Sequence, residues 1–165
     1  MLSAKNDLIC KRLRNEGDRL LALFEALTPD RWQTVIYTDG MNWSIKDVLA
    51  HQVSVERKFQ FYGQDILNGG EGAPEGFVVN EFNNAEVAGL SDRSVAELLA
   101  ELRSARQATI DFVGTLAESD FTRRGRHPVF GIISMEEMFK LIYRHNMLHA
   151  RDIRKATGGT DHDTD

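Results

Sequence analysis

Three segments of this chain begin with a serine that is followed three residues later by an acidic side chain, and each continues with apolar residues at helical spacing. The pairs are Ser44 with Asp47, Ser94 with Glu97, and Ser134 with Glu137. In such a capping box the serine oxygen accepts a backbone N–H of the first helical turn, and the acidic side chain accepts the N–H of the serine. The pattern predicts helices that begin at Ser44, near Ser91 or Ser94, and at Ser134.

A further helix is predicted over residues 3–26, where apolar side chains recur with helical periodicity until Thr28-Pro29. Shorter helical pieces are expected over residues 29–33 and 80–87, the second inside the long connection 69–90. We find no convincing period-two alternation, so the sequence predicts no β-strand. Four amphipathic helices indicate an all-α four-helix bundle. We expect one domain over residues 1–159 and a flexible polar tail over 160–165.

The chain also contains a weak internal repeat. Leu27–Trp32 followed by Ser44–Asp47 parallels Leu116–Phe121 followed by Ser134–Glu137. Each half therefore reads as a helix, a short acidic and aromatic turn, a loop and a capped helix. The repeat suggests two helix pairs related by a pseudo-twofold axis, in which the second and fourth helices have equivalent roles.

Composition excludes several functions. The 165-residue chain has a formal net charge of −5 and a pI near 5.5, so it has no basic footprint for nucleic acid. Its single cysteine, Cys10, excludes an internal disulfide and a cysteine-based zinc site. The first residues hold no apolar run long enough for a signal peptide or a membrane span. We expect a cytoplasmic protein that contacts neither nucleic acid nor membrane.

Histidines are the candidate functional residues. His145 and His149 are one helical turn apart and share a helix face. His51 lies at the edge of the inward stripe of its own helix. Three imidazoles from two helices could hold one divalent metal ion with an open coordination position. The alternative is that all three are ordinary helix residues, although buried imidazoles without partners would each cost about 1–3 kcal/mol.

The other two histidines are weaker candidates. His127 precedes a proline in a loop, where it would cap a turn or be solvated, and His162 lies in the tail. Metal-bound histidines usually donate their second N–H to a carboxylate or carbonyl. Asp47 and Asp152 are placed for this, although the sequence favours a helix cap or a solvated charge for each.

Four residues are candidates for a pocket wall, namely Trp43, Asn80, Asn83 and Asn84. The competing interpretation is that the tryptophan packs before the helix N-cap and that the asparagines serve turns.

The joint placement of these motifs resembles a known family. The segment Met41–His51 is similar to the W-S-x-x-D-x-L-x-H opening of the second helix in the DinB/YfiT-like superfamily. The late H-x-x-x-H resembles the second and third ligands of that family. The resemblance implies an up-down-down-up four-helix bundle, often a homodimer, with zinc or nickel bound by three residues. By position these ligands would be His51, His145 and His149.

Family members of known activity act on low-molecular-weight thiols, and include thiol S-transferases and a mycothiol-dependent maleylpyruvate isomerase. The isomerase branch has a carboxylate at the position of His145. The resemblance therefore implies a metal-dependent transferase or hydrolase that activates a small thiol or water. The alternative is a non-catalytic bundle for small-ligand binding, resistance or stress response, with a structural metal or none.

Overall fold

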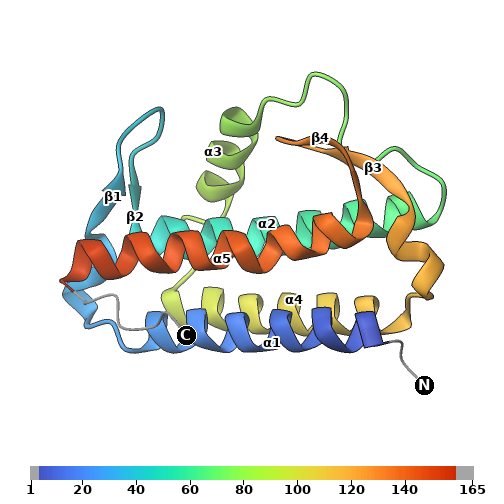
Figure 1. Ribbon diagram of the computed structural model, residues 1–165. Helices are drawn as coiled ribbons and strands as arrows, with labels where there is room; N and C mark the ends of the chain where they lie inside the picture. The colour runs from blue at the N-terminus through green and yellow to red at the C-terminus, as the bar shows by residue number, and fades with distance from the viewer. Residues whose placement is uncertain (1–3, 159–165) are drawn as a thin grey trace.

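The computed structural model describes residues 4–158, in which four long helices pack in two layers (Figure 1). Among these four helices in chain order, the first two each pack against the last two, and the chain runs up-down-down-up through the bundle (Figure 1). This confirms the predicted all-α four-helix bundle. The predicted tail, 160–165, lies outside the described residues. The bundle helices are α1 (Ala4–Glu25), α2 (Ile45–Leu67), α4 (Val95–Thr115) and α5 (Met135–Thr157).

The predicted capping boxes set the starts of three of these helices. The side chains of Ser44, Ser94 and Ser134 each accept the backbone N–H three residues on, and the acidic partner accepts the serine N–H. Helix α4 thus begins after Ser94 rather than Ser91. At the other end of α5, Gly158 adopts a left-handed conformation with φ +77°, which glycine adopts without steric cost.

The prediction that the chain has no strands was wrong. Two short antiparallel hairpins stand at opposite ends of the bundle (Figure 1). Their strands have two to four residues, too few for alternation to be seen in the sequence. The strands are β1 (Val35–Tyr37) with β2 (Trp43–Ser44), and β3 (Arg124–His127) with β4 (Gly131–Ser134).

The internal repeat is present in the fold. Each half consists of a bundle helix, a 3₁₀ turn, a β-hairpin and a capped bundle helix. Helix α3 (Val79–Gly89), predicted over 80–87, is an addition between the halves and packs against α2. The two 3₁₀ turns are η1 (Pro29–Gln33), as predicted, and η2 (Glu118–Thr122).

A buried polar layer divides the core into two apolar clusters. One cluster surrounds Phe24 and Leu49, and the other surrounds Phe121 and Phe139. Between them, Arg106 of α4 donates two hydrogen bonds to Glu56 of α2 and one to Asn146 of α5, at 2.8, 2.8 and 2.6 Å. Asn146 in turn donates to Gln52 of α2 at 2.6 Å. This layer ties α2 and α5 together through α4.

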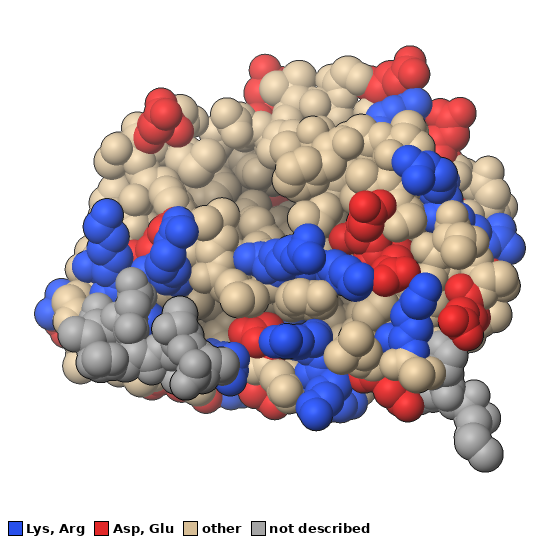
Figure 2. Space-filling view, viewed as in Figure 1, with Lys and Arg blue, Asp and Glu red and all other residues tan. Residues whose placement is uncertain are grey.

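On one face the bundle carries a hollow walled mainly by uncharged side chains (Figure 2). A cavity lies between α2, α3, α5 and the turn of the β3–β4 hairpin. Within residues 4–158 no helix is long and apolar enough to cross a membrane.

Candidate metal centre

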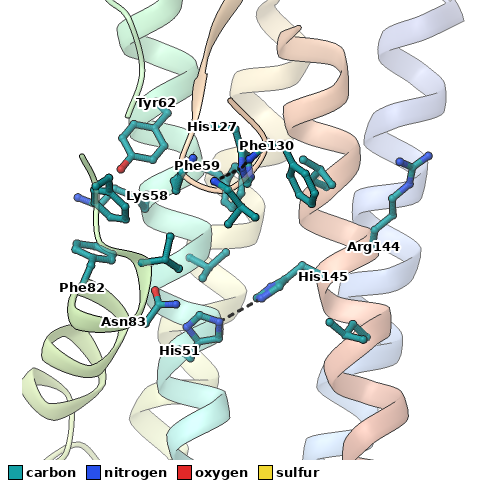
Figure 3. Close-up of a pocket in the computed structure, with 17 residues that line it drawn as sticks. His51, Lys58, Phe59, Tyr62, Phe82, Asn83, His127, Phe130, Arg144 and His145 are labelled. Carbon is teal, nitrogen blue, oxygen red and sulfur yellow. Dashed lines mark hydrogen bonds between the residues drawn. The ribbon is translucent and has the colours of Figure 1, made fainter. Parts of the chain in front are cut away.

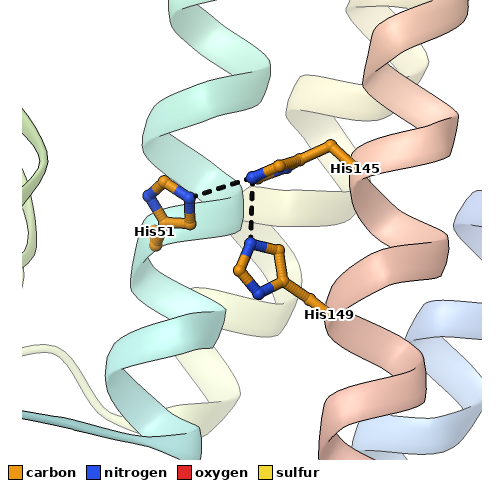
Figure 4. A group of neighbouring side chains, drawn as sticks. All are labelled: His51, His145 and His149. Atoms are coloured by element: carbon orange, nitrogen blue, oxygen red, sulfur yellow. Dashed lines mark hydrogen bonds between the residues drawn. The ribbon is translucent and has the colours of Figure 1, made fainter. Parts of the chain in front are cut away.

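The three predicted histidines meet between α2 and α5, as Figure 4 shows. The Nε2 atom of His145 lies 3.2 Å from Nε2 of His51 and 2.9 Å from Nε2 of His149. One ligand atom from each residue lies within 4.8 Å of the others. His51 and His149 are buried, whereas His145 is partly exposed on the side of the cavity.

All three imidazoles are neutral near pH 7. Burial lowers the pKa of each from 6.5 to about 3, because the charged ring would lose its hydration. The neighbouring histidines lower each pKa further, since two imidazolium charges would repel one another. Neutral imidazole, with one lone pair per ring, is the form that binds a cation.

A hydrogen-bonded chain fixes the tautomer of His149. The hydroxyl of Tyr37, from β1, donates to Oδ2 of Asp152 at 2.7 Å and lies 2.8 Å from Nδ1 of His149. Its single proton goes to the carboxylate, so Nδ1 of His149 must donate to the tyrosine oxygen. The lone pair of Nε2 then points toward the other two histidines. Burial first and then Asp152 raise the pKa of Tyr37, so the hydroxyl stays protonated.

The donor set fits a tetrahedrally coordinated cation. Zn–N bonds of about 2.0–2.1 Å separate two nitrogen ligands by about 3.3 Å, which is close to both Nε2–Nε2 distances. Without a cation, the three rings cannot satisfy both Nε2–Nε2 contacts with hydrogen bonds. Nε2 of His149 is an acceptor, so Nε2 of His145 must donate its one proton to it and then has no lone pair or second proton for Nε2 of His51. A cation that takes three lone pairs removes this conflict.

The second ring nitrogens of His51 and His145 differ from that of His149. Nδ1 of His51 and Nδ1 of His145 are buried and have no hydrogen-bond partner among the described residues. His51 is held instead by packing, because the ring of Trp43 lies 4.8 Å from its own, centre to centre. Among the described residues, therefore, a hydrogen bond from outside the cluster orients His149 alone.

The two carboxylates considered from sequence have separate roles. Asp47 accepts from the backbone and hydroxyl of Ser44 at 2.8 and 2.7 Å, so it is a helix cap. Asp152 reaches His149 only through Tyr37, whose role the sequence analysis missed. The strand that carries this tyrosine lies far from α5 in the chain, so no local spacing pattern links them.

Of the four residues proposed from sequence for a pocket wall, one lines the cavity. Trp43 donates through Nε1 to Asn84 at 3.1 Å, which joins β2 to α3. Asn83 lines the cavity, whereas Asn80 and Asn84 do not.

His127 was predicted to cap or be solvated, and only the first is correct. Its Nδ1 accepts the backbone N–H groups of Val129 and Phe130 at 3.0 and 3.2 Å. The side chain is only 5% exposed and lines the cavity beside His145. Burial lowers the pKa of His127 to about 4. Its place next to a proline gave no sign of this burial.

The up-down-down-up bundle and the three histidines gathered between α2 and α5 define a class of helical proteins with a candidate metal centre. The chain belongs to the DinB superfamily, whose family model matches residues 12–153. This confirms the resemblance seen in the sequence. A search of curated proteins finds no match.

Solved structures of the same fold are distant in sequence. YfiT from Bacillus subtilis, described as a probable metal-dependent hydrolase with an unusual four-helix bundle topology, is 18% identical with a TM-score of 0.76. The alignment covers 97% of this chain and 92% of YfiT. The mycothiol-dependent maleylpyruvate isomerase is 13% identical with a TM-score of 0.75, over 90% of this chain and 60% of the isomerase.

A third similar structure is the colibactin self-resistance protein ClbS in complex with double-stranded DNA. It is 12% identical with a TM-score of 0.74, over 92% of this chain and 94% of ClbS. At these identities the comparisons establish the shared fold alone.

Proposed function

We propose that this chain binds one divalent cation, zinc or nickel, through Nε2 of His51, His145 and His149, and that it is a metal-dependent hydrolase or transferase. The observation that carries the proposal is the gathering of three neutral imidazole nitrogens at 2.9 and 3.2 Å. The description of YfiT as a probable metal-dependent hydrolase supports it.

The residues around the cluster have distinct tasks in this proposal. The cation, when bound, supplies a positive charge that lowers the pKa of a coordinated water or thiol. Tyr37 and Asp152 hold His149 in the tautomer that leaves its Nε2 lone pair free. Trp43 and the bundle core shield the ligands from water on the inner side. His145 faces the cavity, which is where a substrate would approach.

The mycothiol-dependent isomerase among the similar structures supports a low-molecular-weight thiol as the nucleophile. Water is the alternative nucleophile and would make the protein a hydrolase. Imidazole ligands suit both zinc and nickel, so the donor set does not select between them.

The second candidate function is a non-catalytic bundle that binds a small ligand, with a structural metal or none. The cavity beside the histidines favours it, since a cavity can serve binding alone. The two candidates differ in what metal removal does. An enzyme would lose activity and keep its helical content, whereas a structural metal would sustain thermal stability broadly.

The first experiment is elemental analysis of untagged protein purified without chelator. Wild type should contain about one zinc or nickel per chain, and His145→Ala and His149→Ala should lose it, because each removes one of the three protein ligands. His127→Asn is the matched control, since it also removes a buried histidine but should keep the cation. No metal in wild type and no uptake of added zinc or nickel would refute the proposal.

Three further properties belong to the proposal by family resemblance or composition, namely a homodimer, a cytoplasmic location and no binding to nucleic acid. Light scattering at several protein concentrations tests the first, and microscopy of a tagged chain tests the second. Because ClbS was solved with double-stranded DNA, duplex binding should be measured directly. With its net charge of −5, this chain is expected to show no binding at about 0.15 M salt.

A further inference from the structure

A cavity of about 350 Å³ adjoins the histidine cluster, and His51 and His145 form part of its wall (Figure 3). The opposite wall is built from α3 and the β3–β4 turn. This volume is at the lower end of the range typical of small-ligand sites. Most of the remaining wall is aromatic or aliphatic and includes Val55, Phe59, Phe77, Phe82, Phe130 and Leu148.

The charges at this cavity are few and lie at its edge. In the described part of the chain, no aspartate or glutamate lines it. The ammonium group of Lys58 lies 4.7 Å from the ring centre of Phe82 and 5.5 Å from that of Phe61, which partly compensates its charge. The side chain of Arg144 is exposed and points away from the cavity (Figure 3). An anion seated against the apolar wall would lose hydration and gain only the solvent-screened attraction of these two cations at the edge, so the interior of the cavity favours an uncharged molecule.

His127 supplies a directed hydrogen-bond donor in this apolar wall. Because Nδ1 accepts two backbone N–H groups, the neutral ring must carry its proton on Nε2. This Nε2–H is buried and has no partner within residues 4–158. An unused buried donor costs about as much as a lost hydrogen bond, so a ligand that offers an acceptor would recover that free energy.

One of the two aromatic side chains that shield this donor can change its position. The ring of His127 packs between the rings of Phe59 and Phe130, at 5.1 and 5.0 Å between centres. Phe130 stands at the turn of the β3–β4 hairpin and its side chain is 60% exposed. Exposed side chains change rotamer rapidly, so a rotation of Phe130 can uncover the imidazole to a bound molecule.

We propose that this cavity binds an uncharged apolar compound that carries a carbonyl oxygen, and that Nε2–H of His127 donates to that oxygen. The apolar body then packs against Phe59, Phe82 and Phe130. As an assignment of substrate class, this rests on the proposed function, because the compound would be the electrophile that meets the water or thiol at the histidine cluster. As a statement about binding, it stands on the cavity alone.

Three probes of similar shape test the proposal, namely 4-phenyl-2-butanone, butylbenzene and 4-phenylbutyrate. Dissociation constants are measured by ligand-observed NMR, with and without added zinc, on wild type and on two variants. His127→Asn keeps an acceptor near Nδ1 but removes the donor at Nε2. Val55→Trp fills the cavity, with circular dichroism and zinc content as checks that the fold and the cation are retained.

We expect wild type to bind the ketone about 3- to 10-fold more tightly than the hydrocarbon, the usual worth of one hydrogen bond. His127→Asn should bind the two equally, and Val55→Trp should bind neither. Equal wild-type affinities, or an unchanged preference in His127→Asn, would overturn the role of His127. Tighter binding of the carboxylate would overturn the uncharged ligand, and no binding of any probe would overturn the site.

Zinc content separates this inference from the proposed function. If wild type takes up no zinc but the ketone preference depends on His127, the metal proposal fails and the binding site stands. If zinc binds to the histidines and the ketone does not bind, the reverse holds.

Discussion

Removal of the Arg106 guanidinium should destabilise the protein more than any change to a surface ion pair. Arg106 and its partner Glu56 are 5% and 1% exposed, in the polar layer between the two apolar clusters. In Arg106→Met, Glu56 loses both of its hydrogen bonds, and the oxygens of Asn146 and Leu13 lose one each. Breaking a buried ion pair from one side costs about 3–5 kcal/mol, because the remaining charge is left unpaired.

Urea unfolding of metal-free protein, followed by circular dichroism, measures this cost. For a domain of this size the same loss lowers the Tm by about 6–20 °C. The matched control is Arg103→Met, which lies on α4 like Arg106 and removes a half-exposed ion pair with Glu25 of α1. That pair should contribute less than about 1 kcal/mol.

A double variant separates an unpaired charge from lost packing. Glu56→Leu combined with Arg106→Met removes both charges, and should recover at least half of the loss caused by Arg106→Met alone. A loss below about 1 kcal/mol in the single variant would contradict the reasoning. So would a double variant that is less stable than the single one, because the cost would then come from packing.

Three further predictions concern the site and the core. Tyr37→Phe should weaken zinc affinity about 10- to 100-fold in chelator competition, since it removes the partner that orients His149, while Tyr143→Phe should leave it unchanged. The pKa of His127 is near 6.5 in the unfolded chain and about 4 in the folded protein, so unfolding takes up a proton between these pH values and stability falls as pH falls through that range. His127→Asn should reduce the loss of stability between pH 7 and pH 5 by about 2 kcal/mol, as measured by urea unfolding. Gly17→Ala should lower the free energy of unfolding by about 1–3 kcal/mol in the same assay, because the added Cβ would lie 2.5 Å from the Arg106 guanidinium. An unchanged urea midpoint would show that the arginine shifts freely.

Local signals in the sequence account for most of the fold. Capping boxes and apolar periodicity locate α1 and the starts of α2 and α5 within one residue, and they leave the start of α4 open between Ser91 and Ser94, because both signals depend on side chains a few positions apart. The hairpins were missed for the opposite reason. In β3, Gly125 is buried against Ile66, where a Cβ would lie 2.2 Å from a methyl group. That requirement is set by a distant helix and leaves no periodic pattern.

The candidate site shows the same limit. His51, His145 and His149 could be selected because each falls on or near the inward stripe of its own helix and the repeat pairs the two helices. Tyr37 and His127 could not, since both lie in hairpins whose positions depend on how the chain leaves the helices. Sequence periodicity thus selects the three histidines that the fold brings together, whereas the groups that orient one of them or line the cavity require the tertiary fold.

The repeat itself explains why the histidine cluster and the apolar cavity are neighbours. Helices α2 and α5 can be aligned on their N-cap residues, Ser44 and Ser134. In that alignment His51 corresponds to Leu141, His145 to Val55, and His149 to Phe59. The three apolar counterparts all line the cavity. At each of these three aligned positions, one helix carries an imidazole and the other carries an apolar side chain. A molecule in the cavity therefore meets both apolar side chains and imidazoles. A substrate with an apolar body and one polar reactive group matches this combination of apolar and imidazole side chains. An exact repeat would place the same side chain at both aligned positions and would not provide the combination.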